Sequence, residues 1–440
     1  MSILKLKPAC KDYLWGGRRI AEEYGVEYDG DILAEAWELS CHPDGPSTIE
    51  NGPFAGCSLQ DYIDKQGRQV LGVNGRRFKD FPILIKFIDA RQNLSIQVHP
   101  DNAYALKNEG QYGKTEMWYV MDAGPEAFLY YGFKEKISRE EFEKRIKEDT
   151  LLEVLNAVSV QKGDVLFIES GTIHAIGKDI LIAEIQQNSN VTYRVYDYGR
   201  VGKDGKKRDL HIEKALAVTN RVPIVRAKNS YPHVADCDYF TVDKLNLDGH
   251  IMNKMEGQVT EASFVSILIL DGEGNITVGQ ENITYKKGDS FFIPAGSGAY
   301  TVEGYCDALI TTIHEKASPV RLGVDIKEQE THVGLVDAAG QFLASATIKT
   351  MANAKPADLV EDVSLKILSL MEDTGIAMDE CIGLGIGLPG LVNQDNYLVT
   401  CPYFDNWVDV DLKGMFEKYL PLPIEMINND GVLRAAGLLL

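Results

Sequence analysis

The stretch LSIQVHPD, residues 94–101, alternates apolar and polar side chains. This period of two is typical of a half-buried β-strand, with its apolar residues on one face and its polar residues on the other. Ser95, Gln97 and His99 then share the polar face, and Gln97 and His99 can reach one point in space. Pro100 has no N–H to donate, so we expect the strand to end there. Taken alone, the stretch fits a polar edge strand with an incidental histidine equally well.

Composition and charge limit the possible function. A chain of 440 residues, with 45% hydrophobic and 25% charged residues, predicts two or three globular domains. Its 65 acidic and 45 basic residues give a net charge of −20, which opposes binding to nucleic acid. An anionic substrate would have to be held by a few local lysines and arginines. The sequence does not indicate an oligomeric state.

The cysteines and the N-terminus indicate the compartment. Seven cysteines are scattered without a C-x-x-C pair, which argues against a thiolate zinc site and against a disulfide framework. The N-terminal residues MSILKLKPAC lack a signal-peptide core, and no apolar run is long enough to cross a membrane. We therefore expect a cytoplasmic protein without a membrane partner.

Three further stretches have strand patterns: AEAWELS (34–40), FPILIKFI (81–88) and KTEMWYV (114–120). Lys86 is conspicuous inside the nearly apolar second stretch. A lysine there either reaches out to solvent or faces a polar cavity. Because Gln97 and His99 are expected within one hairpin of Lys86, we favour the cavity. By contrast, Ser138 is predicted to open a structural helix that runs to about residue 156.

An internal repeat links two distant segments. KGDVLFIESGTIH (162–174) and KGDSFFIPAGSGA (287–299) match at Lys, Gly, Asp, Phe, Ile and Gly. Ala299 occupies the position of His174, so only the first copy can bind a metal there. The repeat resembles the second motif of cupins, whose fold is a small antiparallel β-barrel.

The first cupin motif would supply Gln97, His99 and Glu116, which join His174 as a set of four ligands. Two imidazoles, a carboxylate and an amide oxygen suit Zn²⁺, with Mn²⁺, Fe²⁺ or Co²⁺ as alternatives. A lone histidine is usually an ordinary core or surface residue. Four potential ligands in this order favour a metal site instead.

Residues 1–316 resemble a type I mannose-6-phosphate isomerase of the short bacterial form. The matching motifs occur in the family's order: YLWGG (13–17), AEAWELS (34–40), LIKFIDARQNLSIQVHPD (84–101), GKTEMWYV (113–120), GTIHAIG (171–177) and QQNSNVTYRVYDYGR (186–200). The resemblance implies interconversion of mannose 6-phosphate and fructose 6-phosphate, by proton transfer between C1 and C2 through a cis-enediol. It also implies that zinc is held by Gln97, His99, Glu116 and His174.

The same resemblance implies which residues line the substrate pocket: Lys86, Ser95, Lys114, Glu184 and Arg194. Of these, Arg194, Glu184 and Lys86 are the expected catalytic residues, and Ser95, Lys114 and Arg194 the expected substrate contacts. Arg194 offers a planar, permanently charged fork for an oxyanion or phosphate. The group that carries the proton stays open. Glu184 is a candidate base, and its alternative role is that of a structural partner of Arg194.

The region after residue 320 resembles the N-terminal half of a ROK-family sugar kinase, which has an actin-like, ribonuclease-H-like α/β fold. Its pattern consists of a hairpin, a helical stripe over 358–371 and three motifs, IGLGIGLPG (382–390), NW (406–407) and PIEMINND (423–430). Asp430 matches the family's general base. However, KEQE (327–330) replaces the expected glycines, and the sequence stops at Leu440, before the family's ATP-binding lobe. We therefore expect Asp430 to be vestigial and this region to be catalytically silent.

The predicted fold class is mainly β, with two cupin-type barrels, a helical insertion and a partial α/β domain. The expected domains are a metal-binding catalytic cupin (1–224), a metal-free cupin (225–316) and a partial kinase-like domain (322–440). Two alternatives to the isomerase remain. One is a sensor that binds a sugar phosphate without catalysis, and the other is a fragment of a bifunctional isomerase–kinase.

Overall fold

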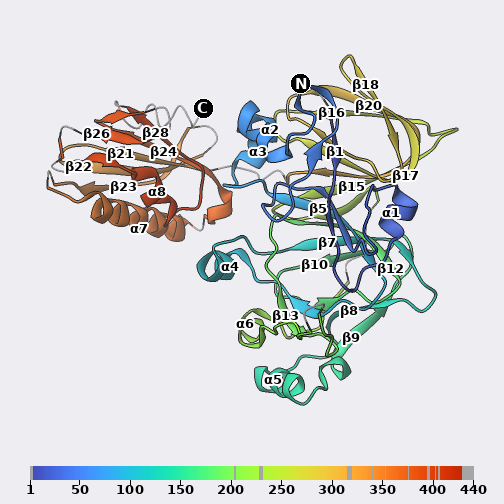
Figure 1. Cartoon of the computed structure of the whole chain (residues 1–440). Helices are drawn as coiled ribbons and strands as arrows, with labels where there is room; N and C mark the ends of the chain where they lie inside the picture. The colour runs from blue at the N-terminus through green and yellow to red at the C-terminus, as the bar shows by residue number, and fades with distance from the viewer. Residues whose placement is uncertain are drawn as a thin grey trace. The chain divides into compact units, whose positions relative to one another are not determined.

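The computed structural model describes residues 3–202, 205–226, 231–314, 320–337, 340–351, 353–374, 376–393, 397–401, 403–404 and 407–428. Two compact units make up the chain: Met1–Val70 with Phe81–His314, and Leu71–Asp80 with Glu315–Leu440. The predicted mainly β class is confirmed (Figure 1). Within the described residues, no helix is long and apolar enough to cross a membrane.

Two antiparallel sheets of the first unit enclose a hydrophobic core. The six-stranded sheet runs in the order β10-β7-β12-β5-β3-β2, formed by β2 (Ala9–Lys11), β3 (Glu35–Leu39), β5 (Ile83–Ala90), β7 (Glu116–Ala123), β10 (Val165–Ile168) and β12 (Ile180–Gln187). The five-stranded sheet runs in the order β13-β6-β11-β8-β9, formed by β6 (Ile96–Val98), β8 (Phe128–Phe133), β9 (Leu155–Ser159), β11 (His174–Ala175) and β13 (Tyr193–Tyr196).

Strand β6 lies within the stretch 94–101, which was predicted to form a strand. Ile96 and Val98 are fully buried in an outer cluster that includes residues of two helices, α5 (Arg139–Lys147) and α6 (Ile212–Val218) (Figure 1). Leu94 departs from the expected alternation, because it precedes the strand and packs in the core between the sheets. The expected hairpin is also wrong, since β5 and β6 belong to different sheets.

The other helices of this unit are short: α1 (Arg19–Tyr24), α2 (Leu59–Gln66) and α4 (Asn102–Glu109). Ser138 caps α5 as predicted, because its Oγ accepts a hydrogen bond of 3.0 Å from the backbone N–H of Glu141. The predicted end near residue 156 is wrong. The helix stops at Lys147, Asp149 adopts a positive φ of 60°, and the chain continues through a 3₁₀ turn, Leu151–Glu153, into β9. The apolar residues beyond α5 still pack in the same cluster, so burial alone could not indicate where the helix ends.

A nine-stranded sheet completes the first unit, with the main order β14-β15-β20-β17-β19-β1-β4. Its strands are β1 (Leu4–Lys7), β4 (Thr48–Ile49), β14 (His233–Asp236), β15 (Thr241–Asp248), β16 (Lys254–Val259), β17 (Val265–Val278), β18 (Glu281–Lys286), β19 (Ser290–Ile293) and β20 (Gly298–Thr312). β17 is one long strand, interrupted by a β-bulge between Ile269 and Asp271.

The two repeat segments adopt the same turn. Gly163 and Gly288 both have a φ of 90°, a conformation that residues with a side chain rarely adopt. The carboxylates of Asp164 and Asp289 each accept a hydrogen bond of 2.9 Å from a backbone N–H three residues earlier. Each turn leads into a short strand, β10 or β19, which pairs with a long one.

The pairing registers show why the two copies differ. Glu116 lies opposite the last residue of β10, whereas Val265 lies opposite the last residue of β19. His174 of the first copy corresponds to Ala299 of the second. The second copy therefore carries apolar side chains where the first has a carboxylate and an imidazole.

The second unit is built on a five-stranded sheet with the order β23-β22-β21-β24-β28. Its strands are β21 (Val320–Ile326), β22 (Glu330–Val336), β23 (Phe342–Lys349), β24 (Cys381–Leu388) and β28 (Ile424–Asn428), and a small sheet contains β25 (Leu391–Val392), β26 (Leu398–Thr400) and β27 (Val408–Val410). The helices are α3 (Gly72–Arg76), α7 (Pro356–Thr374) and α8 (Leu412–Glu417).

The predicted hairpin and helical stripe of the second unit are confirmed. β21 and β22 pair antiparallel, and Leu359, Val363, Ile367 and Met371 are buried along α7. β24 pairs in parallel with β21 and β28, as expected of an α/β fold. Asp430 lies outside the described residues.

Glu38 is a fully buried carboxyl group on β3, a strand that contacts β19. Neither of its oxygens has a hydrogen-bond partner among the described residues. The hydroxyls of Ser266, Ser290 and Thr311, in the strands around β19, are likewise buried without a partner in this part of the chain. Burial raises the pKa of Glu38 well above its usual range, and the charges of Asp289 and Glu50 raise it further.

Glu38→Gln is expected to stabilise the fold increasingly as the pH rises. Above a pH of about 4.5 the unfolded carboxyl ionises, whereas the folded carboxyl keeps its proton until its raised pKa is reached. The native protein therefore loses up to about 1.4 kcal/mol of stability per pH unit in that window, and the amide loses none. Urea unfolding of both proteins at pH 4.5, 5.5 and 6.5 measures the difference. The exposed Glu126→Gln serves as a control, and a pH-independent difference for Glu38→Gln would contradict the prediction.

Candidate metal centre and adjoining cavity

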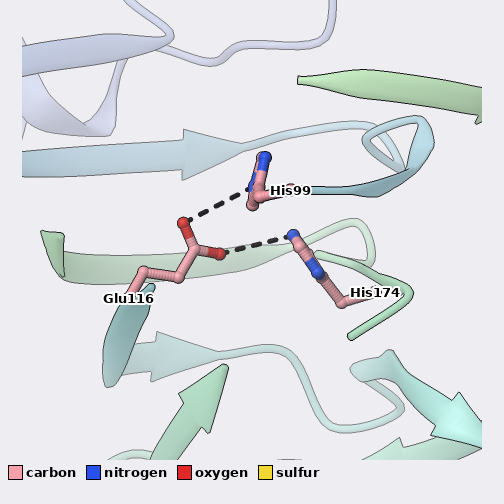
Figure 2. Close-up of side chains that lie close together, drawn as sticks. All are labelled: His99, Glu116 and His174. Carbon is pink, nitrogen blue, oxygen red and sulfur yellow. Dashed lines mark ion pairs between the residues drawn. The ribbon is translucent and has the colours of Figure 1, made fainter. Parts of the chain in front are cut away.

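The six-stranded and the five-stranded sheet of the first unit both contribute to the predicted ligand set. Gln97 of β6 and His174 of β11 are direct cross-strand partners in the five-stranded sheet. His99 directly follows β6, and Glu116 opens β7 in the other sheet. Figure 2 shows the carboxylate of Glu116 between the two imidazoles, with one oxygen directed at each ring.

The distances place three donor atoms around one point. Glu116 Oε1 is 3.3 Å from His174 Nε2, and Glu116 Oε2 is 3.7 Å from His99 Nε2. One ligand atom of each of these residues lies within 4.8 Å of the others, and all three side chains are buried. The amide of Gln97 is 3.4 Å from His174 Nε2. Because the two ends of an amide are nearly isosteric, its oxygen can turn to the same place.

Hydrogen bonds to backbone carbonyls orient both imidazoles. His99 Nδ1 donates to the carbonyl of Val191 and His174 Nδ1 to that of Thr172, each at 2.9 Å. With the proton on Nδ1, each Nε2 presents a lone pair toward Glu116. This arrangement is the usual support of histidines that bind metals.

The donor set fits a divalent cation. Ligand atoms bound to one Zn²⁺ at about 2.0–2.1 Å in tetrahedral geometry lie about 3.3 Å apart. The 3.3 and 3.7 Å separations between Glu116 and the imidazoles are close to that value. Moreover, Oε1 of the fully buried Glu116 has no hydrogen-bond partner among the described residues, and its Oε2 is paired only with charged or ring groups, Lys114 at 2.6 Å and His99 at 3.7 Å. A bound cation would satisfy these oxygens.

Electrostatics favour the neutral, metal-binding form of both histidines. Burial lowers the pKa of His99 well below its usual range, and the nearby charge of Lys114 lowers it further. Burial also lowers the pKa of His174, to about 4. Burial raises the pKa of Glu116, as does the charge of Glu184. A bound cation would reverse the shift of Glu116, because it favours the ionised carboxylate.

Two buried lysines, Lys86 and Lys114, pair with three glutamates, one of which is the candidate metal ligand Glu116. Lys86 Nζ is 3.5 Å from Glu35 and 3.4 Å from Glu184, and only 4% of the residue is exposed. Lys114 Nζ is 2.6 Å from Glu116 and 3.6 Å from Glu184. Lys86 therefore faces the cavity, and the alternative in which it reaches solvent is wrong.

Glu184 belongs to this charge network and not to Arg194. Its Oε2 accepts a hydrogen bond of 2.9 Å from the indole N–H of Trp118, and its Oε1 faces the two lysines. Burial acts to raise the pKa of Glu184, but Lys114 and Lys86 outweigh it and hold the pKa below its usual range. Among the described contacts, none supports the alternative role of Glu184 as a structural partner of Arg194.

A cavity of about 260 Å³ adjoins the metal ligands. All five residues predicted for a substrate pocket line it: Lys86, Ser95, Lys114, Glu184 and Arg194. Gln97 lines it as well. The sequence did not predict the other lining residues, which include Tyr13, Trp15, Glu35, Asn190, Thr192 and Arg208. Tyr13, Trp15 and Glu35 lie in motifs that indicated the family but no role. Arg208 lies outside every motif.

Arg194 lines the cavity together with the neighbouring Arg208. Arg194 Nη1 donates to the carbonyl of Asp209 at 3.0 Å, while its Nε is buried and has no hydrogen-bond partner among the described residues. Burial lowers the pKa of Arg194, and the neighbouring Arg208 and Arg200 lower it further. The unpaired Nε of Arg194 and the neighbouring positive charges make the part of the cavity lined by Arg194 and Arg208 suited to an anion.

Comparison with known proteins identifies the family. Mannose-6-phosphate isomerase ManA of Bacillus subtilis is 35% identical over 319 residues, which cover 70% of this chain and 98% of that protein. The chain belongs to the type I mannose-6-phosphate isomerase family. The family model for the type I phosphomannose isomerase catalytic domain matches residues 3–124, and the model for the mannose-6-phosphate isomerase cupin domain matches residues 229–313.

Two further comparisons agree with this type I isomerase assignment. A mannose-6-phosphate isomerase of Streptococcus mutans is 36% identical over 313 residues, covering 69% of this chain and 95% of that protein. The crystal structure of the mannose 6-phosphate isomerase from Bacillus subtilis aligns with a TM-score of 0.65 and 33% identity, over 71% of this chain and 99% of that chain. The ROK family model matches residues 321–436, so the isomerase region is followed by a ROK domain.

Proposed function

We propose that this protein is a metal-dependent isomerase that interconverts mannose 6-phosphate and fructose 6-phosphate. The buried cluster of His99, Glu116 and His174 beside a cationic cavity is the observation that supports this proposal most strongly. The relatives from Bacillus subtilis and Streptococcus mutans are mannose-6-phosphate isomerases.

Zinc, held by Gln97, His99, Glu116 and His174, is the proposed metal. Two imidazole nitrogens with carboxylate and amide oxygens form a set that Zn²⁺ accepts readily, and Mn²⁺, Fe²⁺ or Co²⁺ are alternatives. When bound, such a cation polarises the sugar carbonyl and stabilises negative charge on the oxygens at C1 and C2. The backbone carbonyls that accept hydrogen bonds from the two Nδ1–H groups keep both imidazoles oriented for this role.

Glu184 is the proposed acceptor of the proton that moves between C1 and C2. The carboxylate lines the cavity, and Lys86, Lys114 and Trp118 keep it ionised. Stabilising the anion also weakens it as a base, so Glu184 depends on the acidity of the C–H bond next to the polarised carbonyl. The pKa of Lys86 is raised, since Glu35 and Glu184 outweigh its burial. Lys86 therefore stays charged and can donate a hydrogen bond to a substrate oxygen.

Arg194 is the proposed phosphate ligand, and Ser95 and Lys114 complete the substrate contacts. The Nε of Arg194, which is buried without a partner in the described structure, can donate to an anion in the cavity. A guanidinium binds two phosphate oxygens at once, whereas an ammonium group acts as a point charge. We further propose the division of the chain at 1–224, 225–316 and 322–440, with the metal site in the first part.

The ROK domain is proposed not to transfer phosphate. Small residues after the first strand would let backbone N–H groups approach phosphates closely. In this chain the turn between β21 and β22 consists of the exposed residues 327–329. It carries a carboxylate at Glu328, and a second one, Glu330, opens β22, while Lys327 Nζ is engaged by Asp325 at 3.2 Å. Two carboxylates at that turn would repel the phosphates of ATP.

A coupled assay tests both proposals on the purified chain. We expect mannose 6-phosphate to be converted to fructose 6-phosphate, conversion to stop after EDTA treatment, and Zn²⁺ to restore it. Proton exchange at C2 of the sugar phosphate is measured as well. An isomerase catalyses this exchange, whereas a sensor that only binds the sugar phosphate does not. No sugar should be phosphorylated when ATP and free sugars are added. Activity that survives metal removal, or ATP-dependent phosphorylation, would contradict the respective proposal.

A further inference from the structure

Three arginines gather around one buried carboxylate next to the cavity. Asp197 directly follows β13 and is almost wholly buried. It accepts two hydrogen bonds from Arg208, from Nε at 2.8 Å and from Nη2 at 2.6 Å. Arg200 also donates to Asp197, from Nε at 3.1 Å and from Nη2. Arg194, in β13 itself, is close enough for both guanidiniums to lower its pKa.

Among the described residues, two carboxylates oppose these three positive charges: Asp197, and Asp209, whose charge acts on Arg194. Burial acts to raise the pKa of Asp197, but the hydrogen bonds from Arg208 and Arg200 prevail and keep it low, so Asp197 is ionised. The cluster therefore has an excess of positive charge, in a chain whose net charge is −20. A local excess of this kind attracts an anion to the adjoining cavity.

Arg200 and Arg208 differ in what else they contact. Arg200 Nη1 donates to the carbonyl of Asn93 at 2.6 Å, and its guanidinium lies 5.5 Å from the ring centre of Tyr198. Arg208 lines the cavity together with Arg194, whereas Arg200 is not among the lining residues. Arg200 thus anchors Asp197, and Asp197 in turn aims Arg208.

Backbone hydrogen bonds tie the segment that carries Arg208 to β13. The N–H of His211 donates to the carbonyl of Arg194 at 2.7 Å, and the N–H of Arg194 bonds to His211 Nδ1 at 3.1 Å. Val201 and Lys207 form an isolated β-bridge within the same segment. These contacts hold Arg208 next to Arg194 although they are 14 positions apart in the sequence.

We propose that Arg208 is a second phosphate-binding residue, which forms the phosphate end of the cavity with Arg194, and that Asp197 is its positioning residue. This proposal rests on the proposed isomerase function for the identity of the substrate. Gln97 and Lys114, which belong to or contact the candidate metal cluster, line the same cavity, so a sugar phosphate with its phosphate at the arginines would present C1 and C2 to the candidate metal ligands. Arg208 then contributes to binding and to selection of phosphorylated over free sugars, not to proton transfer.

The test compares Arg208→Gln and Arg208→Lys with Arg145→Gln. Arg145 also carries a charge pair, but with Glu141 and Glu153 on and after α5. Inorganic phosphate is titrated into each zinc-loaded protein by calorimetry, and kcat and KM for mannose 6-phosphate are measured separately. Hydrogen bonds to charged groups are strong enough that Arg208→Gln should weaken phosphate binding by about 10- to 100-fold. KM should rise by a similar factor while kcat changes only a few-fold.

Asp197→Asn tests the positioning role. We expect a smaller loss of phosphate affinity than in Arg208→Gln, with bound zinc and kcat retained, and recovery in Asp197→Glu. Unchanged phosphate affinity and KM in Arg208→Gln would overturn the proposal, as would a loss confined to kcat. Because Arg208 is 30% exposed, its variants should fold, and their melting temperatures check this. If the unaltered chain binds phosphate but does not isomerise mannose 6-phosphate, the proposed function fails while the phosphate site stands.

Discussion

Replacing His99 or His174 by alanine is expected to remove both the bound metal and the isomerase activity. Each imidazole supplies one of four proposed ligands, and each is fully buried, so solvent cannot easily replace it. Loss of residues that merely orient metal ligands already weakens binding by about 10- to 100-fold, and loss of a ligand itself should exceed about 100-fold. Elemental analysis of the purified variants and the coupled assay measure the two effects.

Glu116→Gln should weaken metal binding less than either histidine variant, because an amide oxygen can still coordinate but lacks the charge. The control is His233→Ala, which removes a half-exposed histidine of β14 that pairs with Asp243. This variant should keep its metal and its activity. Full metal occupancy together with full activity in His99→Ala or His174→Ala would rule out the assigned centre.

Arg194→Lys is expected to lower kcat/KM by roughly 10²-fold, or about 2.7 kcal/mol, although it preserves the charge. Lysine has no planar fork: its donors share one nitrogen, so it cannot hold the carbonyl of Asp209 with one nitrogen while another faces the substrate. The loss should exceed that of Arg208→Lys, because the Nε of Arg194 is buried without a hydrogen-bond partner among the described residues, whereas Arg208 is paired with Asp197. Steady-state kinetics with mannose 6-phosphate give both values.

Arg145→Lys in α5 is the matched control for Arg194→Lys, because Arg145 pairs with Glu141 of α5 and with Glu153 just after it, and it does not line the cavity. Its kcat/KM should match that of the unaltered protein. An effect of Arg194→Lys within a few-fold of the control would mean that the substrate does not reach this end of the cavity.

Local pattern was enough to predict the strands that carry the site. The strand patterns in residues 34–40, 81–88 and 114–120 are properties of neighbouring residues, and β3, β5 and β7 lie within two or three residues of them. The end of α5 was not predictable in this way. Leu151 and Leu155 continue its apolar pattern, yet they are buried in a 3₁₀ turn and a strand. A hydrophobic stripe records burial, and more than one backbone conformation can satisfy it.

Some residues of the candidate site could be predicted from local sequence, and others could not. Gln97, His99, Glu116 and His174 could be predicted as ligands because their residue types lie in recognisable motifs. The role of Lys86 needed the tertiary structure, since only the pairing of β5 with β3 and β12 brings Glu35 and Glu184 to its ammonium group. Register between strands distant in sequence decides such contacts, and alternation within one strand carries no information about it.

Residue types at short, fixed spacings were enough to predict the mainly β class, a ROK-like second region and the set of candidate metal ligands. Long-range packing had to be seen to find that three candidate ligand atoms lie within 4.8 Å of one another and that Arg208 reaches the same cavity as Arg194. It also decided that Glu38 is buried without a partner in the described structure. Charge, burial and hydrogen bonding at these positions come from segments that only long-range strand pairing and loop packing bring together.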